Sequence, residues 1–226
     1  MKLVKLALTP PLVAISVALC AALSSFATTY DVTSMDELSD AITKAGDGDE
    51  IVVTKGFSLT ATTYRLEKEV TLRGATSDPS DSVLNAGWNN LRIELANAKA
   101  VVKDLTIDGG NIGSGDAGTV LIDEAGGLLS NCVIKNNHGI KGPTALMLKG
   151  GRATGCVIEG MTARDGCGYV KVTNGAMFDH SIVRNCKFNS GGTTTMYGGI
   201  QLVKGTVSDC LISNNKIYTQ YGATAL

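Results

Sequence analysis

One short pattern recurs along this chain and constrains its fold more than any other feature. The segment 198–215, GGIQLVKGTVSDCLISNN, has counterparts in ALMLKGGRATGCVIEGM and YVKVTNGAMFDHSIVRNC. A more divergent copy reads TVLIDEAGGLLSNCVIKNN, and VVKDLTIDGG is the end of an earlier one. One aliphatic position marks each copy, at intervals of 24 to 29 residues: Ile107, Ile134, Ile158, Val183 and Ile212. Self-similarity at such a period predicts a solenoid.

Each copy predicts two strands separated by a tight turn. Alternating apolar pairs define the first strand: Val120/Ile122, Leu146/Leu148, Val170/Val172 and Ile200/Leu202. Glycines such as Gly126 and Gly127 follow, and glycine permits a sharp backbone turn. The second strand carries the marked aliphatic residue and, two positions earlier, one of this set: Leu105, Cys132, Cys156, Ser181 or Cys210. Asn137 or Asn215 follows this strand, and a Gly- and Thr-rich loop of variable length completes the unit.

Such a unit is too short to bury its own apolar face, so neighbouring units must stack. Stacking aligns like residues into an aliphatic ladder inside, a cysteine ladder at one corner and an asparagine ladder at the turn. The sequence therefore predicts a single-stranded parallel β-helix, with repeats over 101–226. A β-sandwich is the alternative, but it needs antiparallel hairpins and gives no reason for cysteines to recur in register.

Residues 28–100 are predicted to form an N-terminal cap and the first irregular coils. Ser34 and Glu37 form a capping box, and Met35, Leu38, Ile42 and Ala45 follow at helical spacing. Gly46 is expected to end the helix in the left-handed conformation. An amphipathic helix laid across the open end of a β-helix would prevent edge-to-edge aggregation. Irregular strands are expected around 64–66, 70–73, 83–85 and 91–95, and Trp88 is expected to pack within the cap.

Residues 1–27 have the features of a secretory signal peptide. Lys2 and Lys5 precede an apolar core over 12–23, and Ser25-Phe26-Ala27 fits the cleavage rule. An uncleaved anchor and a lipoprotein site at Cys20 are the weaker alternatives. The mature segment itself is not expected to insert into a membrane. The end, YGATAL, begins a further strand without a polar cap, so the chain is expected to continue into a longer protein.

Charge and cysteine content narrow the function further. The formal net charge is −1, no basic patch is present, and nucleic acid is therefore not an expected partner. Five cysteines remain after the leader, an odd number that excludes complete intramolecular pairing. Cys132, Cys156 and Cys210 are expected to stay reduced and to act as small hydrophobic residues. Cys167 and Cys186 are assigned to a loop and a turn, where the two could pair.

The chain resembles the secreted right-handed β-helix proteins of the pectin-lyase-like superfamily, in particular bacterial autotransporter-like surface passengers. The likeness covers 28–226 and depends on SMDELSDAITKAGDGDEIVV, VTLRGA, VVKDLTIDGG and the GG-x-L-x-x-G…C-x-I-x-x-N coils. It implies a right-handed helix of coils behind an N-terminal capping helix, in a protein that is secreted or held at the cell surface or outer membrane. The fold itself does not specify a function.

Enzymes of this superfamily use acidic and basic residues on the outside of a sheet. The sequence has no Asn-Thr-Asp, Asp-Asp or Gly-His-Gly motif, and Asn137–Gly139 and Arg92–Glu94 are poor fragments of the hydrolase pattern. Asp179-His180 is an acid–histidine pair without the surroundings that the family has. Three or more acids on one external face would favour an enzyme, and the sequence does not indicate such a cluster. No catalytic residue is therefore predicted.

The remaining candidates are surface residues. Lys149 and Lys171 are expected to face outward and, with Arg164 and Asp165, could form a ligand surface. Asp108 and Asp116 lie in DGGNIGSGDAG, which is similar to a calcium-binding loop but occurs once, so a flexible loop and no cofactor are expected.

The sequence thus predicts an exported, non-catalytic β-helix scaffold at the cell surface. Its expected work is adhesion, through a glycan or through a host or neighbouring surface protein. The alternative is a polysaccharide lyase or glycoside hydrolase that acts on acidic polysaccharide.

Overall fold

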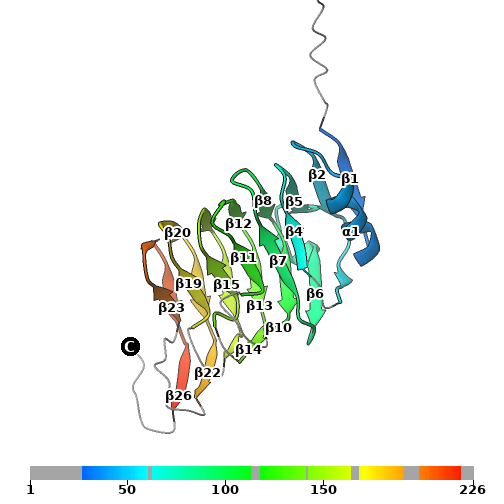
Figure 1. Ribbon diagram of the computed structural model, residues 1–226. Helices are drawn as coiled ribbons and strands as arrows, with labels where there is room; N and C mark the ends of the chain where they lie inside the picture. Colours follow the sequence, from blue (N-terminus) through cyan, green and yellow to red (C-terminus); the bar gives the residue numbers. More distant parts are fainter. Residues whose placement is uncertain are drawn as a thin grey trace, which may run out of the picture.

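The chain folds into a right-handed parallel β-helix, as the repeat predicts (Figure 1). The computed structural model describes residues 27–60, 63–112, 118–140, 142–163, 168–190 and 199–219. Four parallel sheets run along the axis. Sheet A contains β1 (Thr29–Val32), β2 (Glu50–Val53), β5 (Thr71–Gly74), β8 (Val101–Lys103), β12 (Leu128–Ser130), β16 (Arg152–Thr154), β20 (Ala176–Asp179) and β24 (Gly205–Ser208).

The other three sheets share the same coils. Sheet B contains β3 (Phe57–Ser58), β6 (Val83–Gly87), β9 (Thr106–Gly109), β13 (Val133–Lys135), β17 (Val157–Glu159), β21 (Ile182–Arg184) and β25 (Leu211–Ser213). Sheet C contains β4 (Thr63–Leu66), β7 (Arg92–Leu95), β11 (Val120–Ile122), β15 (Leu146–Leu148), β19 (Val170–Val172) and β23 (Ile200–Leu202). Sheet D contains β10 (Asn111–Ile112), β14 (His138–Gly139), β18 (Thr162–Ala163), β22 (Lys187–Ser190) and β26 (Lys216–Thr219).

Each regular coil has four strands, so the prediction of two strands per unit is wrong. The predicted second strand divides into a sheet A strand and a sheet B strand, and a short sheet D strand follows. Single left-handed residues make these corners, as at Asn131 (φ 47°) and Asn136 (φ 57°). Asparagine tolerates this conformation better than most residues, so the chain can turn without a loop. A corner of one residue leaves almost no mark on the hydrophobic pattern.

The asparagine ladder lies one residue earlier than predicted. Asn137 points inward and is buried, and Met161 and Cys186 occupy the equivalent position in the following coils. The asparagines that recur stand at the left-handed corner after sheet B: Asn136, Asn185 and Asn214. The side-chain amide of Asn214 donates to Asn185 Oδ1 at 2.6 Å, which links the last two of these corners.

The interior consists of the predicted aliphatic ladders. Ile107, Ile134, Ile158 and Val183 are fully buried in one continuous core with the inward residues of β4, β7, β11, β15 and β19. In the last described coil the prediction fails, because Ile212 and Leu202 are 53% and 52% exposed. The cysteine prediction is confirmed, because Cys132 and Cys156 are buried free thiols on this ladder and Cys210 is a half-buried one. Cys186 is also a buried free thiol and lies inside the coil rather than in an exposed turn. Cys167 lies outside the described residues.

The predicted capping helix is α1 (Met35–Lys44), which lies at the N-terminal end of the stack (Figure 1). Leu38 and Ala41 are buried against the core. The Glu37 N–H donates to Ser34 Oγ at 3.3 Å, whereas the Glu37 carboxylate accepts from the Thr33 N–H at 2.7 Å, one residue before the expected partner. The Gly46 prediction is wrong, because Gly46 is not left-handed. Its N–H donates to Asp49 Oδ2 at 2.8 Å, so an aspartate side chain closes this end.

Two further features complete the fold. A short 3₁₀ turn, η1 (Pro79–Asp81), joins β5 to β6. Within the described residues, no helix combines the length and the apolar character needed to cross a membrane. Trp88 does not pack within the cap, because 76% of it is exposed. It stands on the turn between β6 and β7, where its ring faces His138.

Close contact between coils predicts a sharp difference between two glycines. At Gly151 (φ 60°) a Cβ would lie 2.3 Å from the Gly127 carbonyl oxygen, whereas at Gly175 (φ 81°) it would meet nothing within 4 Å. Gly151→Ala should therefore destabilise the protein by about 2–5 kcal/mol, from left-handed strain plus a backbone clash. Gly175→Ala, the matched control, should cost only about 1–2 kcal/mol. Urea denaturation would measure both, and equal losses would contradict the inferred packing.

The buried thiols should resist alkylation in the native state. Burial raises the pKa of Cys156 to about 12 and that of Cys186 to about 11, and it raises the pKa of Cys132 as well. Since the thiolate is the reactive form, these three cysteines should label far more slowly than Cys210. Pulsed alkylation with peptide-level mass spectrometry would compare the sites, and urea-unfolded protein is the control. Fast native labelling of Cys156 would contradict the buried ladder.

Candidate functional site

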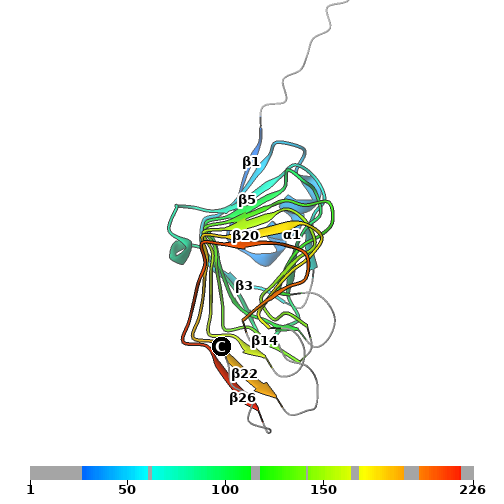
Figure 2. The ribbon, with the colours of Figure 1, turned by 90° about the vertical axis from the view of Figure 1, so that its left-hand side faces the viewer.

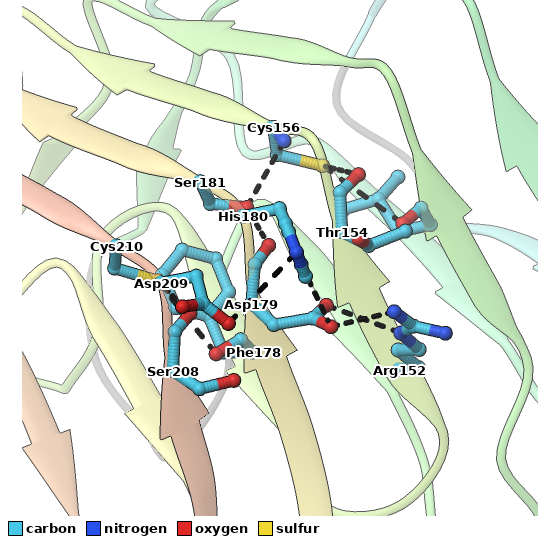
Figure 3. Close-up of polar contacts among 11 residues, drawn as sticks. Arg152, Thr154, Cys156, Phe178, Asp179, His180, Ser181, Ser208, Asp209 and Cys210 are labelled. Carbon is cyan, nitrogen blue, oxygen red and sulfur yellow. Dashed lines mark hydrogen bonds and ion pairs between the residues drawn. The ribbon is translucent and has the colours of Figure 1, made fainter.

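The first charged cluster lies at the corner between sheets A and B and consists of Arg152, Asp179, His180 and Asp209 (Figure 3). Arg152 projects outward from β16 and Asp179 from the adjacent β20. Arg152 Nε donates to Asp179 Oδ1 at 3.1 Å, and Nη2 donates to Oδ2 at 2.5 Å. The Asp179 side chain is only 4% exposed, so this bidentate ion pair supplies most of the hydrogen bonds that water would give to an exposed carboxylate. We call this group the corner cluster.

His180 completes the cluster because the backbone turns at its Cα. Its φ of 48° is left-handed, like that of Asn131 two coils earlier, and the imidazole therefore stands outside the coil. His180 Nδ1 lies 3.2 Å from Asp179 Oδ2, and Nε2 lies 3.8 Å from Asp209 Oδ2 on the next coil. A carboxylate that orients an exposed imidazole is also found where histidine acts as a general base.

The electrostatics of the corner cluster are dominated by the guanidinium. Hydrogen bonding from Arg152, helped by Thr154 and His180 and opposed by burial, lowers the pKa of Asp179 to about 2. Asp179 is therefore ionised at neutral pH and does not serve as a proton donor there. Ser181, the next hydroxyl along the chain, is buried and donates to the Asp179 carbonyl oxygen at 2.7 Å, so it is directed away from His180 and into the backbone.

The second charged cluster lies on the outer face of sheet C and gathers three acids around Arg65. Nε of Arg65 donates to Glu67 at 2.8 Å, Nη1 bonds Glu94, and Nη2 lies 3.3 Å from Asp123. The register places Arg65 beside Glu94, with Asp123 one coil further. The expectation that no face carries three acids is therefore wrong. We call this group the Arg65 cluster.

The predicted ligand-surface lysines do share one face. Lys171 projects from β19 beside Met147 of β15, and Lys149 follows the end of β15. Arg164 and Asp165 lie outside the described residues. Two residues on the outer face of sheet C, Leu121 and Met147, are only 6% and 3% exposed, although they do not belong to the main core cluster.

The calcium candidates are only partly visible. Asp108 Oδ1 accepts from the Asn136 side-chain amide at 2.8 Å, and Oδ2 lies 3.4 Å from Lys135 Nζ. Asp116 lies outside the described residues. Across the described part of the chain, no group of three or more His, Cys, Asp or Glu residues is arranged to hold a metal ion.

Sequence reasoning missed most of both clusters for a common reason. Arg152 and Asp179 stand one coil apart, and the Arg65 cluster spans three successive coils, so their members are far apart in sequence. Only Asp179-His180 is visible as a local pair. The four-strand register would have aligned the rest, but the corners that set this register are single residues.

Comparison with known proteins identifies no family for this chain. No protein-family model and no curated protein matches this chain. Among solved structures, the chain is similar to a mutant of the PL6 family alginate lyase AlyGC, with 13% sequence identity and a TM-score of 0.43. The match covers 84% of this chain, which spans 38% of the length of that protein. The sheets themselves define the class, a right-handed parallel β-helix protein.

The corner cluster predicts a specific pH dependence of stability. The native pKa of Asp179, about 2, lies below its ordinary value of 3.8, so its stabilising effect is complete above about pH 4 and is lost as the pH falls towards 2. At pH 7, Asp179→Asn should lower the free energy of unfolding by about 1–3 kcal/mol. The gap between wild type and variant should close between pH 4 and pH 2. Urea titrations across this range would test it, and a gap that stays constant would refute the assignment.

Proposed function

We propose that this protein is an exported, non-catalytic β-helix scaffold that acts at the cell surface, where it adheres to a glycan or to a surface protein. The sequence features of a signal peptide over 1–27 support export. The observation that carries the proposal is the pairing of outer-face charges between successive coils. These pairs tie carboxylates to the stack rather than leaving them available for proton transfer.

The pairs recur on sheets A and B, in addition to the Arg65 cluster on sheet C. On sheet B, Asp108 lies 3.4 Å from Lys135, and Arg184 Nε donates to Glu159 at 2.9 Å. These residues occupy one outward row, in which the charge alternates from coil to coil.

On sheet A, two ion pairs have the same diagonal geometry across adjacent strands, but the acidic and the basic residue change places between them. Arg73 Nε donates to Glu50 at 3.0 Å across β2 and β5, and Arg152 pairs with Asp179 across β16 and β20. In each pair the residue of the earlier coil stands at the start of the outward row and its partner two positions further along. The repetition of this geometry favours a structural role for the corner cluster, because a catalytic group has no reason to share it.

The Arg65 cluster favours the alternative, a polysaccharide lyase or glycoside hydrolase that acts on acidic polysaccharide. Hydrolases use a pair of carboxyl groups, and lyases use a base beside a neutralised uronate. Three acids on one external face could supply such groups. Each of them, however, contacts the same guanidinium, so all three carboxylates are held in one ion-pair network around Arg65.

Turnover and binding assays on the full chain would separate the two functions. The protein should release no unsaturated uronate and no reducing ends from polygalacturonate, alginate or chondroitin sulfate. It should nevertheless be retained by immobilised glycan or by cells, and immunoblotting should find it in the surface fraction or the medium.

Product release that Glu94→Gln abolishes and the control Glu159→Gln preserves would establish the enzyme and overturn the scaffold. Glu159 is a suitable control because it is also an outer-face acid paired with an arginine, on sheet B instead of sheet C. Failure to bind glycans, surface proteins or cells would equally overturn the scaffold.

A further inference from the structure

Sheet D lies along one edge of the molecule (Figure 2), and its strands carry a row of polar and cationic residues. The register aligns His138, Thr162, Lys187 and Lys216 on four successive coils. Side chains alternate along a strand, and their neighbours Ala163 and Phe188 are buried in the core. The aligned residues therefore face outward, and both lysines are exposed.

Exposed aromatic residues stand at both ends of this row. Trp88 comes from the turn between β6 and β7, which runs beside sheet D because the Asn111 N–H donates to the Asn89 carbonyl at 2.9 Å. Its ring centroid lies 5.5 Å from that of His138. At the other end, Tyr218 is 52% exposed and shares the outer face of β26 with Lys216. We call Trp88, His138, Thr162, Lys187, Lys216 and Tyr218 the D strip.

The charge of the D strip is positive. None of the five sheet D strands contains an acidic residue. The acids on the adjoining sheet B row, Asp108 and Glu159, already pair with Lys135 and Arg184. The backbones at Lys187 and Lys216 are one strand spacing apart, about 4.8 Å, so the two cationic side chains leave adjacent strands side by side on an exposed surface. Bringing like charges together is unfavourable unless an anion offsets it.

We propose that the D strip binds an acidic glycan, a sugar chain that carries carboxylate or sulfate groups. The ring of Trp88 would stack on the apolar face of a sugar, since indole combines a large apolar surface with a polar edge. Lys187 and Lys216 would pair with anionic groups on successive sugars, because a sugar unit in an extended chain is comparable in length to the spacing of the coils. This inference rests on the proposed scaffold function and supplies its ligand class and its site.

The remaining charge of the molecule favours a glycan over nucleic acid. The chain has a formal net charge of −1, whereas nucleic-acid-binding surfaces are set in strongly basic proteins. Two lysines and one exposed tryptophan fit a ligand of lower charge density with apolar faces. Exposed tryptophan is also among the residues most enriched where binding energy concentrates.

Trp88 allows a direct test because it is the only tryptophan in the chain. Its emission should change in a saturable way when polygalacturonate or dextran sulfate is added to the full chain, and should not change with neutral dextran. A comparison of the affinities for polygalacturonate and for dextran sulfate shows whether carboxylate or sulfate groups are preferred. The effect should weaken with added salt, because exposed charges are screened.

Substitutions then locate the site. Lys187→Ala/Lys216→Ala should weaken binding by about tenfold. The control Lys55→Ala/Lys204→Ala removes the same charge from two exposed lysines outside sheet D and should leave affinity unchanged. Trp88→Ala, followed by calorimetry because the reporter is lost, should also weaken binding while the circular dichroism spectrum stays that of the wild type.

The outcomes separate this inference from the proposed function. Retention on acidic glycan with no response from Trp88 and no effect of the lysine variants would overturn the D strip and leave the scaffold function standing. No binding to any acidic glycan would overturn the D strip outright. Equal binding of polyphosphate would also overturn it, because a polyanion without sugar faces should gain nothing from Trp88.

Discussion

The backbone hydrogen bonds between successive coils are the constraint on which the rest of this molecule depends. Every sheet of the described residues is parallel, and each strand inside a sheet pairs with the equivalent strand of the coil before and after it. The neighbours of a residue along the axis are therefore the equivalent residues of the adjacent coils. Residues of one type at one position of the repeat consequently form a line along the stack. The buried thiols, the corner asparagines, the paired charges and the D strip are all expressions of this alignment. Stability in such a stack is shared between adjacent coils rather than concentrated at one centre.

The sequence predicts the interior of this structure better than its outline. Aliphatic ladders such as Ile134 and Ile158 repeat visibly, and the amphipathic pattern around Leu38 predicts the capping helix. The four-strand coil was missed because Asn131 and Asn136 each turn the chain alone. The helix ends with a hydrogen bond from the Gly46 N–H to the Asp49 side chain instead of the expected left-handed glycine. Such a side-chain hydrogen bond has no simple sequence signature. The exposure of Trp88 could not be predicted from the sequence, because it depends on how the turn between β6 and β7 is held. That turn brings Trp88 beside His138, which lies two coils further along the stack.

The charged surface divides into two kinds of region. In the corner cluster, the Arg65 cluster and the sheet B row, carboxylates lie against cations of neighbouring coils. Such pairs add specificity to the stacking register, since a coil shifted by one residue would turn these side chains to the opposite face. The D strip lacks acidic partners on its own strands, and it is the place where unbalanced charge and exposed aromatic surface coincide. This contrast within one fold is what separates a structural surface from a binding one.

The coils differ in length without differing in register, and the differences are confined to certain corners. From β8 onward, residues at equivalent register positions in sheets A, B and D follow one another at a fixed interval within each coil, as in Val101, Thr106 and Asn111 or Leu128, Val133 and His138. The connection from sheet D back to sheet C varies, and it is longest between β22 and β23. Insertions and deletions can therefore accumulate beside the D strip while the stack remains intact. In such a molecule the connections beside the D strip can change in sequence and length, and can accept grafted peptides, while the packing of the core stays the same.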